Sequence, residues 1–263
     1  MSSVPEGEPP LRLTWIGHST VRIDVGDLRL LTDPLLLRHN GPLRRRGPRP
    51  LPEQWSQADA VLLSHLHHDH AELRSLRLMP GVPVLTGSGN ASWLRKHGVQ
   101  GTGAEEWTDV GDAQVRLVTA LHHSRPMPHR PNEAHGHLVR SRTTTLWAAG
   151  DTSLYVGMAD LPGLAGVDRL DVVLVPIGGW GPRLSKGHMG PAEAAEACAR
   201  TKARYALPVH WGTLHAPLMT WVSDWFERPL DAFTAHVAAV APRCRVVRIG
   251  LGETWSLPSD AHL

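Results

Sequence analysis

The sequence feature that most constrains this chain is the run Ser64-His65-Leu66-His67-His68-Asp69-His70. It follows the short apolar segment 60–63, which is typical of a buried strand, and it precedes a stretch with the composition of a helix. We therefore expect the run on the loop of a strand-loop-helix unit. Imidazole nitrogens and carboxylate oxygens are ligands that zinc, manganese and iron accept in proteins, so the run predicts a metal site.

The spacing within the run suits two metal ions. Because successive side chains of an extended segment point to opposite sides, His65 and His67 are expected to face the same way. Asp69 and His70, at the start of the following helix, are expected to turn toward a second ion. This alternation points His68 away from the other two histidines, so we assign it a structural role and not a ligand role. A chance cluster of solvated histidines is the alternative, and the position directly after a buried-type strand disfavours it.

Two ions that also hold a water need more donors than the run supplies, so ligands are expected after other predicted strands. The candidates at strand ends are His122 or its neighbour His123, Asp151 and His210. Each is weak alone, because a histidine or aspartate at a strand end is more often a hydrogen-bonded turn residue. Together they supply the missing donors, and the carboxylate of Asp151 can bridge two cations.

Apolar periodicity and turn residues predict two similar halves, each a sheet with helices on one face. Strands are expected at 11–16, 21–25, 28–32, 60–63, 82–86, 137–140, 144–148, 171–176 and 205–209, with two more turning at Gly111-Asp112 within 107–121 and a closing pair at 245–249 and 253–257. Helices are expected over 69–79, 90–97, 191–202 and 225–240. No linker separates the halves, so residues 11–263 are predicted to form one α/β (α+β) domain after a disordered tail, residues 1–10.

Charge and composition disfavour several functions. The formal net charge is only +2 and the calculated pI is 8.8, so there is no strong signature of nucleic-acid binding. The basic run Arg44-Arg45-Arg46 lies among prolines and is interpreted as a solvated loop. No segment approaches the ~20 apolar residues of a membrane span, and no signal peptide begins the chain, so a cytoplasmic protein is expected. Cys198 and Cys244 are expected to be buried thiols of a reducing compartment.

Several motifs, the histidine run first among them, resemble those of the metallo-β-lactamase fold superfamily, whose hallmark is HxHxDH. The closer likeness is to the branch of the ascorbate-6-phosphate lactonases and the N-acyl phosphatidylethanolamine phospholipase D enzymes. It covers the chain from about Leu11 to Trp255 and rests on Gly17-His18-Ser19-Thr20, Thr32-Asp33-Pro34, Ala120-Leu121-His122, Gly150-Asp151-Thr152, Gly187-His188-Met189-Gly190-Pro191 and Pro208-Val209-His210-Trp211-Gly212-Thr213. The resemblance implies a four-layer αββα sandwich of the metallo-β-lactamase type.

The resemblance also implies how two divalent cations would be held. Its ligand sets are His65, His67 and His122 for one ion and Asp69, His70 and His210 for the other, with Asp151 bridging. It thereby favours His122 over His123. It places Asp33 behind the histidine loop, which it steadies, and His18 in a similar position, with a buried structural histidine as the alternative. Zinc matches these ligands best, and manganese or iron are also acceptable.

These residues predict hydrolysis by a metal-activated water. A divalent ion lowers the pKa of its bound water from 15.7 to about 7, so two ions can share a hydroxide near neutral pH. Asp69 is expected to orient this nucleophile and take its proton. The resemblance places His188 beside the metals as a contact to substrate or leaving group, with a hydrogen-bonded helix-entry residue as the alternative. Trp180 and Trp211 either wall an apolar pocket or fill core.

Two features depart from familiar members of the superfamily. No cysteine stands at a ligand position, which disfavours the antibiotic-hydrolysing members that use a thiolate ligand. The segment 124–135 carries no substrate signature and receives no role.

The leading hypothesis is a dinuclear-metal-dependent hydrolase acting on a small ester, lactone or phosphodiester. A nuclease is the alternative enzyme, disfavoured by the near-neutral charge and the lack of a basic stripe. The alternative from another class is a non-catalytic metal-binding or regulatory protein of the same fold. A redox di-iron role is disfavoured because His67 stands where that branch usually has a glutamate. The expected partner is a small-molecule substrate. The sequence leaves the oligomeric state open, although related proteins often form homo-oligomers.

Overall fold

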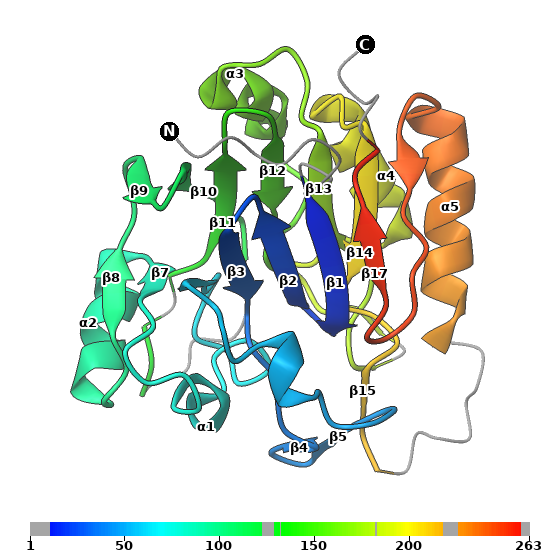
Figure 1. Ribbon diagram of the computed structural model, residues 1–263. Helices are drawn as coiled ribbons and strands as arrows, with labels where there is room; N and C mark the ends of the chain where they lie inside the picture. Colours follow the sequence, from blue (N-terminus) through cyan, green and yellow to red (C-terminus); the bar gives the residue numbers. More distant parts are fainter. Residues whose placement is uncertain (1–10, 123–128, 132, 182, 218–225, 259–263) are drawn as a thin grey trace.

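The structure is a computed structural model that describes residues 11–122, 129–131, 133–181, 183–217 and 226–258. The predicted tail 1–10, the alternative ligand His123 and the first residue of the predicted helix 225–240 lie outside the described residues. Within the described part, the strands form two sheets of seven strands that face each other and a smaller sheet of three strands (Figure 1).

The first sheet is built mainly from the N-terminal half of the chain. Its strands in spatial order are β17 (Thr254–Ser256), β1 (Arg12–Gly17), β2 (Thr20–Val25), β3 (Leu28–Thr32), β6 (Ala60–Leu62), β7 (Val84–Thr86) and β8 (Gly101–Gly103). β1, β2 and β3 form an antiparallel meander, and Gly26 adopts the left-handed backbone (φ 56°) that the tight β2–β3 turn requires. From β3 to β8 the neighbouring strands run parallel.

The second sheet is built from the C-terminal half. Its strands in spatial order are β16 (Arg245–Val246), β14 (Tyr205–Val209), β13 (Val172–Pro176), β12 (Thr145–Ala148), β11 (His135–Arg140), β10 (Ala113–Thr119) and β9 (Thr108–Val110). The strands from β12 through β13 and β14 to β16 are parallel. Because parallel strands end at the same edge of a sheet, the loops after them meet there, and such an edge is the usual place of an α/β site.

Helices flank both sheets, and on the first sheet they pack toward its β6–β8 end. α1 (Leu73–Leu76) and α2 (Ser88–Lys96) lie over the first sheet, and α3 (Leu161–Ala165), α4 (Pro191–Arg200) and α5 (Arg228–Val240) lie over the second, with short 3-10 helices at Pro52–Gln54 and Val156–Asp160 (Figure 1). The expected αββα sandwich is therefore confirmed. None of the helices in the described ranges is both long and apolar enough to cross a lipid bilayer.

Side-chain alternation along the central strands explains the layers. Leu30 and Leu62 point into the core between the two sheets, whereas their neighbours Leu31 and Val61 pack under α1 and α2. A strand that is apolar on both faces must be covered on both faces, which is why β3 and β6 lie inside the sandwich.

Two predicted elements were wrong. The helix expected over 69–79 is reduced to α1, because the backbone N–H groups of His70 and Ala71 both donate to the carbonyl of His67 (3.1 and 2.7 Å) and turn the chain before a helix starts. The predicted closing strand pair is also absent, since β16 runs beside β14 in the second sheet and β17 beside β1 in the first. Their apolar patterns predicted strands correctly but contain nothing that specifies the partner.

The interpretation of Arg44-Arg45-Arg46 as a solvated loop was also wrong for its middle residue. The small third sheet contains β4 (His39–Asn40), β5 (Leu43–Arg45) and β15 (Leu214–His215). Arg45 is buried in it and donates to the carbonyls of Ile16, Leu35 and Pro48. Burying a guanidinium requires such acceptors, so this arginine joins the small sheet to the first large sheet.

Candidate metal centre

The predicted donors gather at the edge of the sandwich where strands of both sheets end. The histidine run follows β6, and the loops after β10, β12 and β14 supply His122, Asp151 and His210. The structure brings all seven predicted donors together, and His18 and His188 join them, in groups whose donor atoms lie within 4.8 Å of one another. Four separate loops therefore converge on one place.

One group contains three imidazoles and no carboxylate. Nδ1 of His67 lies 3.0 Å from Nε2 of His122, and the ring of His65 is centred 4.4 Å and 4.6 Å from the rings of these two residues. We call His65, His67 and His122 the three-histidine group. Three converging nitrogens that leave a fourth position open are typical of a catalytic zinc site.

A second group contains a carboxylate as well as imidazoles. Oδ2 of Asp69 lies 3.6 Å from Nε2 of His210 and 3.9 Å from Nε2 of His70. We call Asp69, His70 and His210 the aspartate group. The Asp69 side chain is 15% exposed, whereas both imidazoles are almost completely buried, so the carboxylate forms the open side of this group.

The carboxylate of Asp151 lies between the two groups. Its Oδ2 is 3.1 Å from Nε2 of His70, 3.3 Å from Nε2 of His210 and 4.0 Å from Nε2 of His65. Asp151 also shares a group of potential donors with His122. One buried acidic side chain thus contacts imidazoles that belong to both groups.

The outer nitrogens of three imidazoles are held by protein oxygens. Nδ1 of His70 lies 2.7 Å from a carboxylate oxygen of Asp33. Nδ1 of His122 and Nδ1 of His210 each lie 2.8 Å from a backbone carbonyl, that of Gly187 and that of Gly178. Because a backbone carbonyl only accepts, Nδ1 of His122 and of His210 carries a proton, and the inward-pointing Nε2 offers a lone pair to a metal once the ring is neutral.

The inner atoms fit a metal ion better than a hydrogen-bond network. Among the described residues, Nε2 of His65, His70 and His210 and Oδ1 of Asp151 are buried atoms without a hydrogen-bond partner. Nε2 of His70 and of His210 approaches Oδ2 of Asp151 to 3.1 and 3.3 Å, yet neither contact forms a hydrogen bond. Buried polar atoms rarely lack partners, and divalent cations with nitrogen and oxygen ligands would satisfy these four.

The acidic side chains of the site are held in their charged form. Burial raises the pKa of a carboxyl, but the charges of His210 and His70 outweigh that effect and hold the pKa of Asp151 well below its usual range. Against the same effect of burial, His70 and the hydrogen bond from His18 hold the pKa of Asp69 well below its usual range. Both carboxylates are therefore available as ligands at neutral pH.

The imidazoles of the two groups differ in protonation. Burial lowers the pKa of His65 and of His122, and it lowers that of His67 to about 4. In the aspartate group burial acts in the same direction, but Asp151 and other carboxylates overcome it, so the pKa of His70 lies well above the ordinary value and that of His210 is raised to about 9. Without a metal, the three-histidine group is neutral at pH 7 and the aspartate group holds protons.

His18 and His188 both contact carboxylates of the site. Nε2 of His18 lies 3.1 Å from Oδ2 of Asp69, and its ring is centred 4.0 Å from that of His210. Nε2 of His188 lies 3.1 Å from Oδ2 of Asp151, and its Nδ1 lies 3.1 Å from the carbonyl of Ser185. His18 therefore lies directly against the aspartate group.

Backbone strain is concentrated around the site. Among the described residues four that are not glycine have positive φ, and three of them, His18 (55°), Asp33 (33°) and His210 (60°), lie here. Left-handed backbone at such residues costs roughly 1–3 kcal/mol each and persists where surrounding contacts enforce it. One such contact is the backbone hydrogen bond from the His210 N–H to the His18 carbonyl (3.0 Å).

Two supporting residues were not predicted from the sequence. Ser64 donates from its backbone N–H and from its hydroxyl to the two oxygens of Asp33 (2.8 and 2.7 Å), and its hydroxyl lies 2.9 Å from Nδ1 of His65. Arg130 donates to the carbonyls of Leu66 and Ala71 (2.7 and 3.2 Å), at the two ends of the turn that carries Asp69 and His70. No motif indicates Arg130; it lies in the segment 124–135, for which the sequence suggested no role.

The remaining sequence expectations have simpler outcomes. Trp211 is core, because it is buried and stacks on Trp15 with ring centroids 5.2 Å apart. Trp180 is 48% exposed on the loop that carries His188. His68 is exposed and belongs to none of the donor groups among the described residues, and its carbonyl accepts a hydrogen bond from the Asn40 side chain.

Comparisons with known proteins agree with this geometry. A family model described as a beta-lactamase superfamily domain matches residues 28–211. A UPF0173 metal-dependent hydrolase of Rhizobium etli is 28% identical, over 88% of this chain and 97% of its own length. N-acyl-phosphatidylethanolamine-hydrolyzing phospholipase D 1 of Caenorhabditis elegans is 25% identical, over 94% of this chain and 76% of its own length.

The fold also has solved counterparts. Igni18, a metallo hydrolase from the archaeon Ignicoccus hospitalis, superposes with a TM-score of 0.71 at 21% identity and covers 94% of this chain and 98% of its own. At that identity the likeness concerns the fold alone. Since the family model spans most of the chain and the donor groups lie where the strands end, this chain belongs to the beta-lactamase superfamily, has the metallo-β-lactamase fold and stands among its metal-dependent hydrolases.

Proposed function

We propose that this protein hydrolyses a small ester, lactone or phosphodiester with two divalent cations. The three-histidine group would hold one ion, the aspartate group would hold the other, and Asp151 would bridge them. Zinc is the ion that this nitrogen and oxygen ligand set suits best, and manganese and iron fit acceptably.

The position of Asp151 is the observation that carries the proposal. Its Oδ2 lies 3.1–4.0 Å from imidazole nitrogens of both groups, and its other oxygen is buried without a hydrogen bond among the described residues. Two cations repel each other unless negative charge lies between them, and a carboxylate with a low pKa supplies that charge. A site for a single ion would leave one of the two groups of donors without a metal ion.

When bound, such ions activate a water as nucleophile and stabilise negative charge on the oxygen of the bond that is cleaved. Asp69 would orient that water and accept its proton, because its carboxylate is charged and faces the open side of the site. The His188 side chain is 12% exposed, and its Nε2 would contact the substrate or leaving group beside Asp151.

Two side chains would hold these residues in place. Asp33 accepts the hydrogen bond from Nδ1 of His70 and two from Ser64, and so fixes the loop that carries the run. His18 hydrogen-bonds Asp69 and would keep that carboxylate turned toward the aspartate group. Outer partners of this kind commonly change metal affinity or activity by about 10–100-fold.

The substrate class rests on the residues of the site and on relatives. The donor groups of the described residues contain no cysteine, and the hydroxyl of Ser64 is buried and donates to Asp33, so water is the expected nucleophile. The phospholipase D relative supports a phosphodiester, and the lactonase-like motifs support a lactone. Hydrolysis of either bond develops negative charge on oxygen, which two bound cations would stabilise.

We also propose that residues 11–263 form one hydrolase domain, since one apolar cluster contains side chains of both large sheets. A cytoplasmic location is proposed because both cysteines are buried and unpaired, which fits a reducing compartment.

The direct test combines metal analysis with a substrate panel. Purified protein is assayed for bound metal by mass spectrometry and for hydrolysis of bis(p-nitrophenyl) phosphate, p-nitrophenyl phosphate, a lactone and a thioester. The same assays are run on Asp69→Asn and on the control Asp231→Asn, an exposed aspartate on α5 whose partner is Arg248. We expect two ions per chain, turnover of at least one diester or lactone, and loss of turnover only in Asp69→Asn.

One result would reverse the proposal in favour of a metal-binding protein without turnover. In that result, the wild-type protein binds two ions but hydrolyses no compound on the panel faster than the Asp69→Asn variant does. Binding of one ion per chain would contradict the dinuclear mechanism but would leave the assignment as a hydrolase intact.

A further inference from the structure

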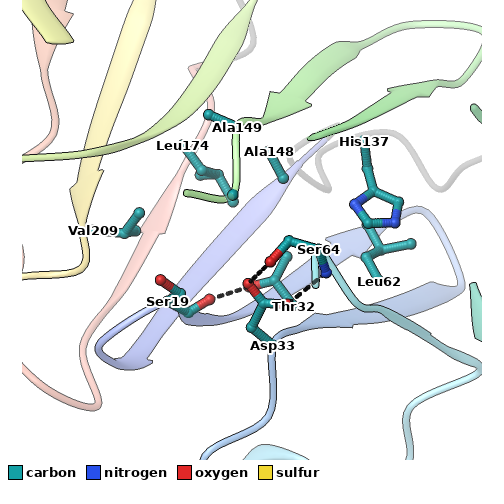
Figure 2. A pocket seen from close by; sticks show the side chains of 11 residues that line it. Ser19, Thr32, Asp33, Leu62, Ser64, His137, Ala148, Ala149, Leu174 and Val209 are labelled. Carbon is teal, nitrogen blue, oxygen red and sulfur yellow. Dashed lines mark hydrogen bonds between the residues drawn. The ribbon is translucent and has the colours of Figure 1, made fainter. Parts of the chain in front are cut away.

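A small cavity lies directly behind the candidate metal centre. Its volume is about 20 Å³, and the residues that line it include Ser19, Asp33, Ser64, His137, Gly150 and Val209 (Figure 2). Three of the lining residues, Ser64, Gly150 and Val209, immediately precede a predicted donor in the chain. The cavity is therefore placed where the strands that carry the donors meet.

The cavity is the right size for one water molecule. A water needs about 10–15 Å³ of space accessible to its own radius, and this cavity has about 20 Å³. Substrate-sized molecules do not fit. The lining side chains of Ser19, Thr32, Asp33, Ser64 and His137 are polar and buried. Apolar cavities stay dry, whereas small polar ones hold ordered water.

The hydroxyl of Ser19 supplies an independent observation. Ser19 is 6% exposed, and its Oγ has no hydrogen-bond partner among the described residues. Its backbone is fixed, because its carbonyl accepts a hydrogen bond from the Thr32 hydroxyl (2.6 Å). A buried hydroxyl is rarely left without a partner, so a missing partner is expected beside it.

Other polar groups on the lining complete a water site. The carboxylate of Asp33 accepts from Ser64 and from His70, and carboxylate oxygens have room for a further donor. Nε2 of His137 lies 3.1 Å from the carbonyl of Leu85, which can only accept, so Nδ1 of His137 is left as an acceptor. A water with two to four such partners is stably held.

We infer that this cavity holds one ordered water, bound by the Ser19 hydroxyl and the Asp33 carboxylate, and that Ser19 is a positioning residue for the metal centre. The water links β1–β2, which carry Ser19, to Asp33, and Asp33 holds both His70 and the Ser64 backbone. Ser19 thus acts on the donors through the water and through Asp33. The role in metal binding rests on the proposed function, whereas the water itself does not.

The test combines crystallography with metal affinity. High-resolution crystal structures are determined for the wild-type protein, Ser19→Ala and Ser19→Val, and zinc affinity is measured by competition with a chelator. Valine replaces the hydroxyl and fills the cavity, whereas alanine leaves space for the water. The control is Thr14→Val, which removes a hydroxyl of equal burial whose partner is Thr254.

We expect solvent density within hydrogen-bond distance of Ser19 Oγ and Asp33 in the wild-type protein, and none in Ser19→Val. The zinc dissociation constant is expected to rise about tenfold in Ser19→Val, less in Ser19→Ala, and not in Thr14→Val. If Ser19→Val fails to fold, Ser19→Ala still reports through the density and the smaller rise.

Two results would overturn the inference. An empty cavity, or a Ser19 hydroxyl that is hydrogen-bonded to a protein group, would contradict the proposed water. Unchanged zinc affinity in both Ser19 variants would contradict the positioning role of Ser19. Failure of the proposed function is a different outcome, because a wild-type protein that holds the water but hydrolyses nothing leaves this site intact.

Discussion

The three-histidine group and the aspartate group lie side by side, yet they would meet a metal ion in different protonation states. In the first group burial and neighbouring imidazoles lower the pKa values, to about 4 for His67. In the second the adjacent carboxylates raise them, to about 9 for His210. A metal would enter the first group without displacing protons and would have to displace them from the second. Two neighbouring sites on one fold can therefore differ in affinity through charge alone.

Asp151 contacts imidazoles of both groups, so its replacement should have the largest effect on metal binding and hydrolysis. Asp151→Asn keeps the size of the side chain but removes the charge between the groups. We expect the loss of at least one bound ion and a fall in hydrolysis greater than the roughly 100-fold that loss of an outer partner costs. Metal content and turnover of bis(p-nitrophenyl) phosphate measure both effects. Two tightly bound ions in this variant would show that the groups do not share the carboxylate.

Removing one imidazole from each group should separate the two ions. His67 belongs only to the three-histidine group and His210 only to the groups around Asp69 and Asp151. His67→Ala and His210→Ala are each expected to retain about one ion per chain, with hydrolysis reduced at least as strongly as by loss of an outer partner, about 100-fold. Substituting cobalt for the native ion allows the remaining site to be identified by its absorption spectrum. Identical spectra for the two variants would contradict the assignment of separate groups.

The pH dependence of metal binding should differ between the groups. The pKa of His210 is raised to about 9, so between neutral pH and about pH 9 metal binding displaces its proton. Affinity at the aspartate group should rise about tenfold per pH unit for each proton displaced. The pKa of His67 is lowered to about 4, so affinity at the three-histidine group should stay constant near neutrality and fall only in acid. Calorimetry at several pH values measures both. Parallel slopes for the two ions would contradict the comparison.

The smallest expected effect concerns Arg130, which touches neither group directly. Its guanidinium holds the carbonyls of Leu66 and Ala71 around the turn of the aspartate group. Arg130→Met should weaken binding of one ion about tenfold, and Arg130→Lys by less, because lysine keeps the charge and can still donate to a carbonyl. The control is Arg77→Met, whose guanidinium donates to the His97 carbonyl away from the site. Equal weakening of both ions by Arg130→Met would mean that the arginine supports the fold as a whole.

Much of the fold could be predicted because strand signals are local. Alternation and turn residues predicted β1, β2, β3, β10, β13 and β14 within a residue or two, since each pattern is set by neighbours in the chain. The assignment of β16 and β17 to different sheets could not be predicted in this way. Strand pairing depends on the three-dimensional path of the chain, and two short apolar segments near one another in sequence are equally able to pair elsewhere.

The helix predicted over 69–79 failed for a related reason. The helix-like composition of the segment predicted it correctly near α1, but the backbone N–H groups of His70 and Ala71 are used in a turn at His67. The loop that carries the candidate metal ligands needs this turn so that its side chains converge. Functional sites are where local propensity and tertiary structure most often disagree.

By itself, the sequence determined that this protein carries histidine and aspartate side chains able to bind metal, because ligand chemistry is a property of residue types and their spacing. Only the tertiary structure decided that Asp151 lies between two groups, that His18 touches Asp69, that Arg130 and Ser64 support the loop, and that a cavity lies behind Asp33. These are distances between residues far apart in the chain. They follow from how two sheets pack, which no single segment of the sequence contains.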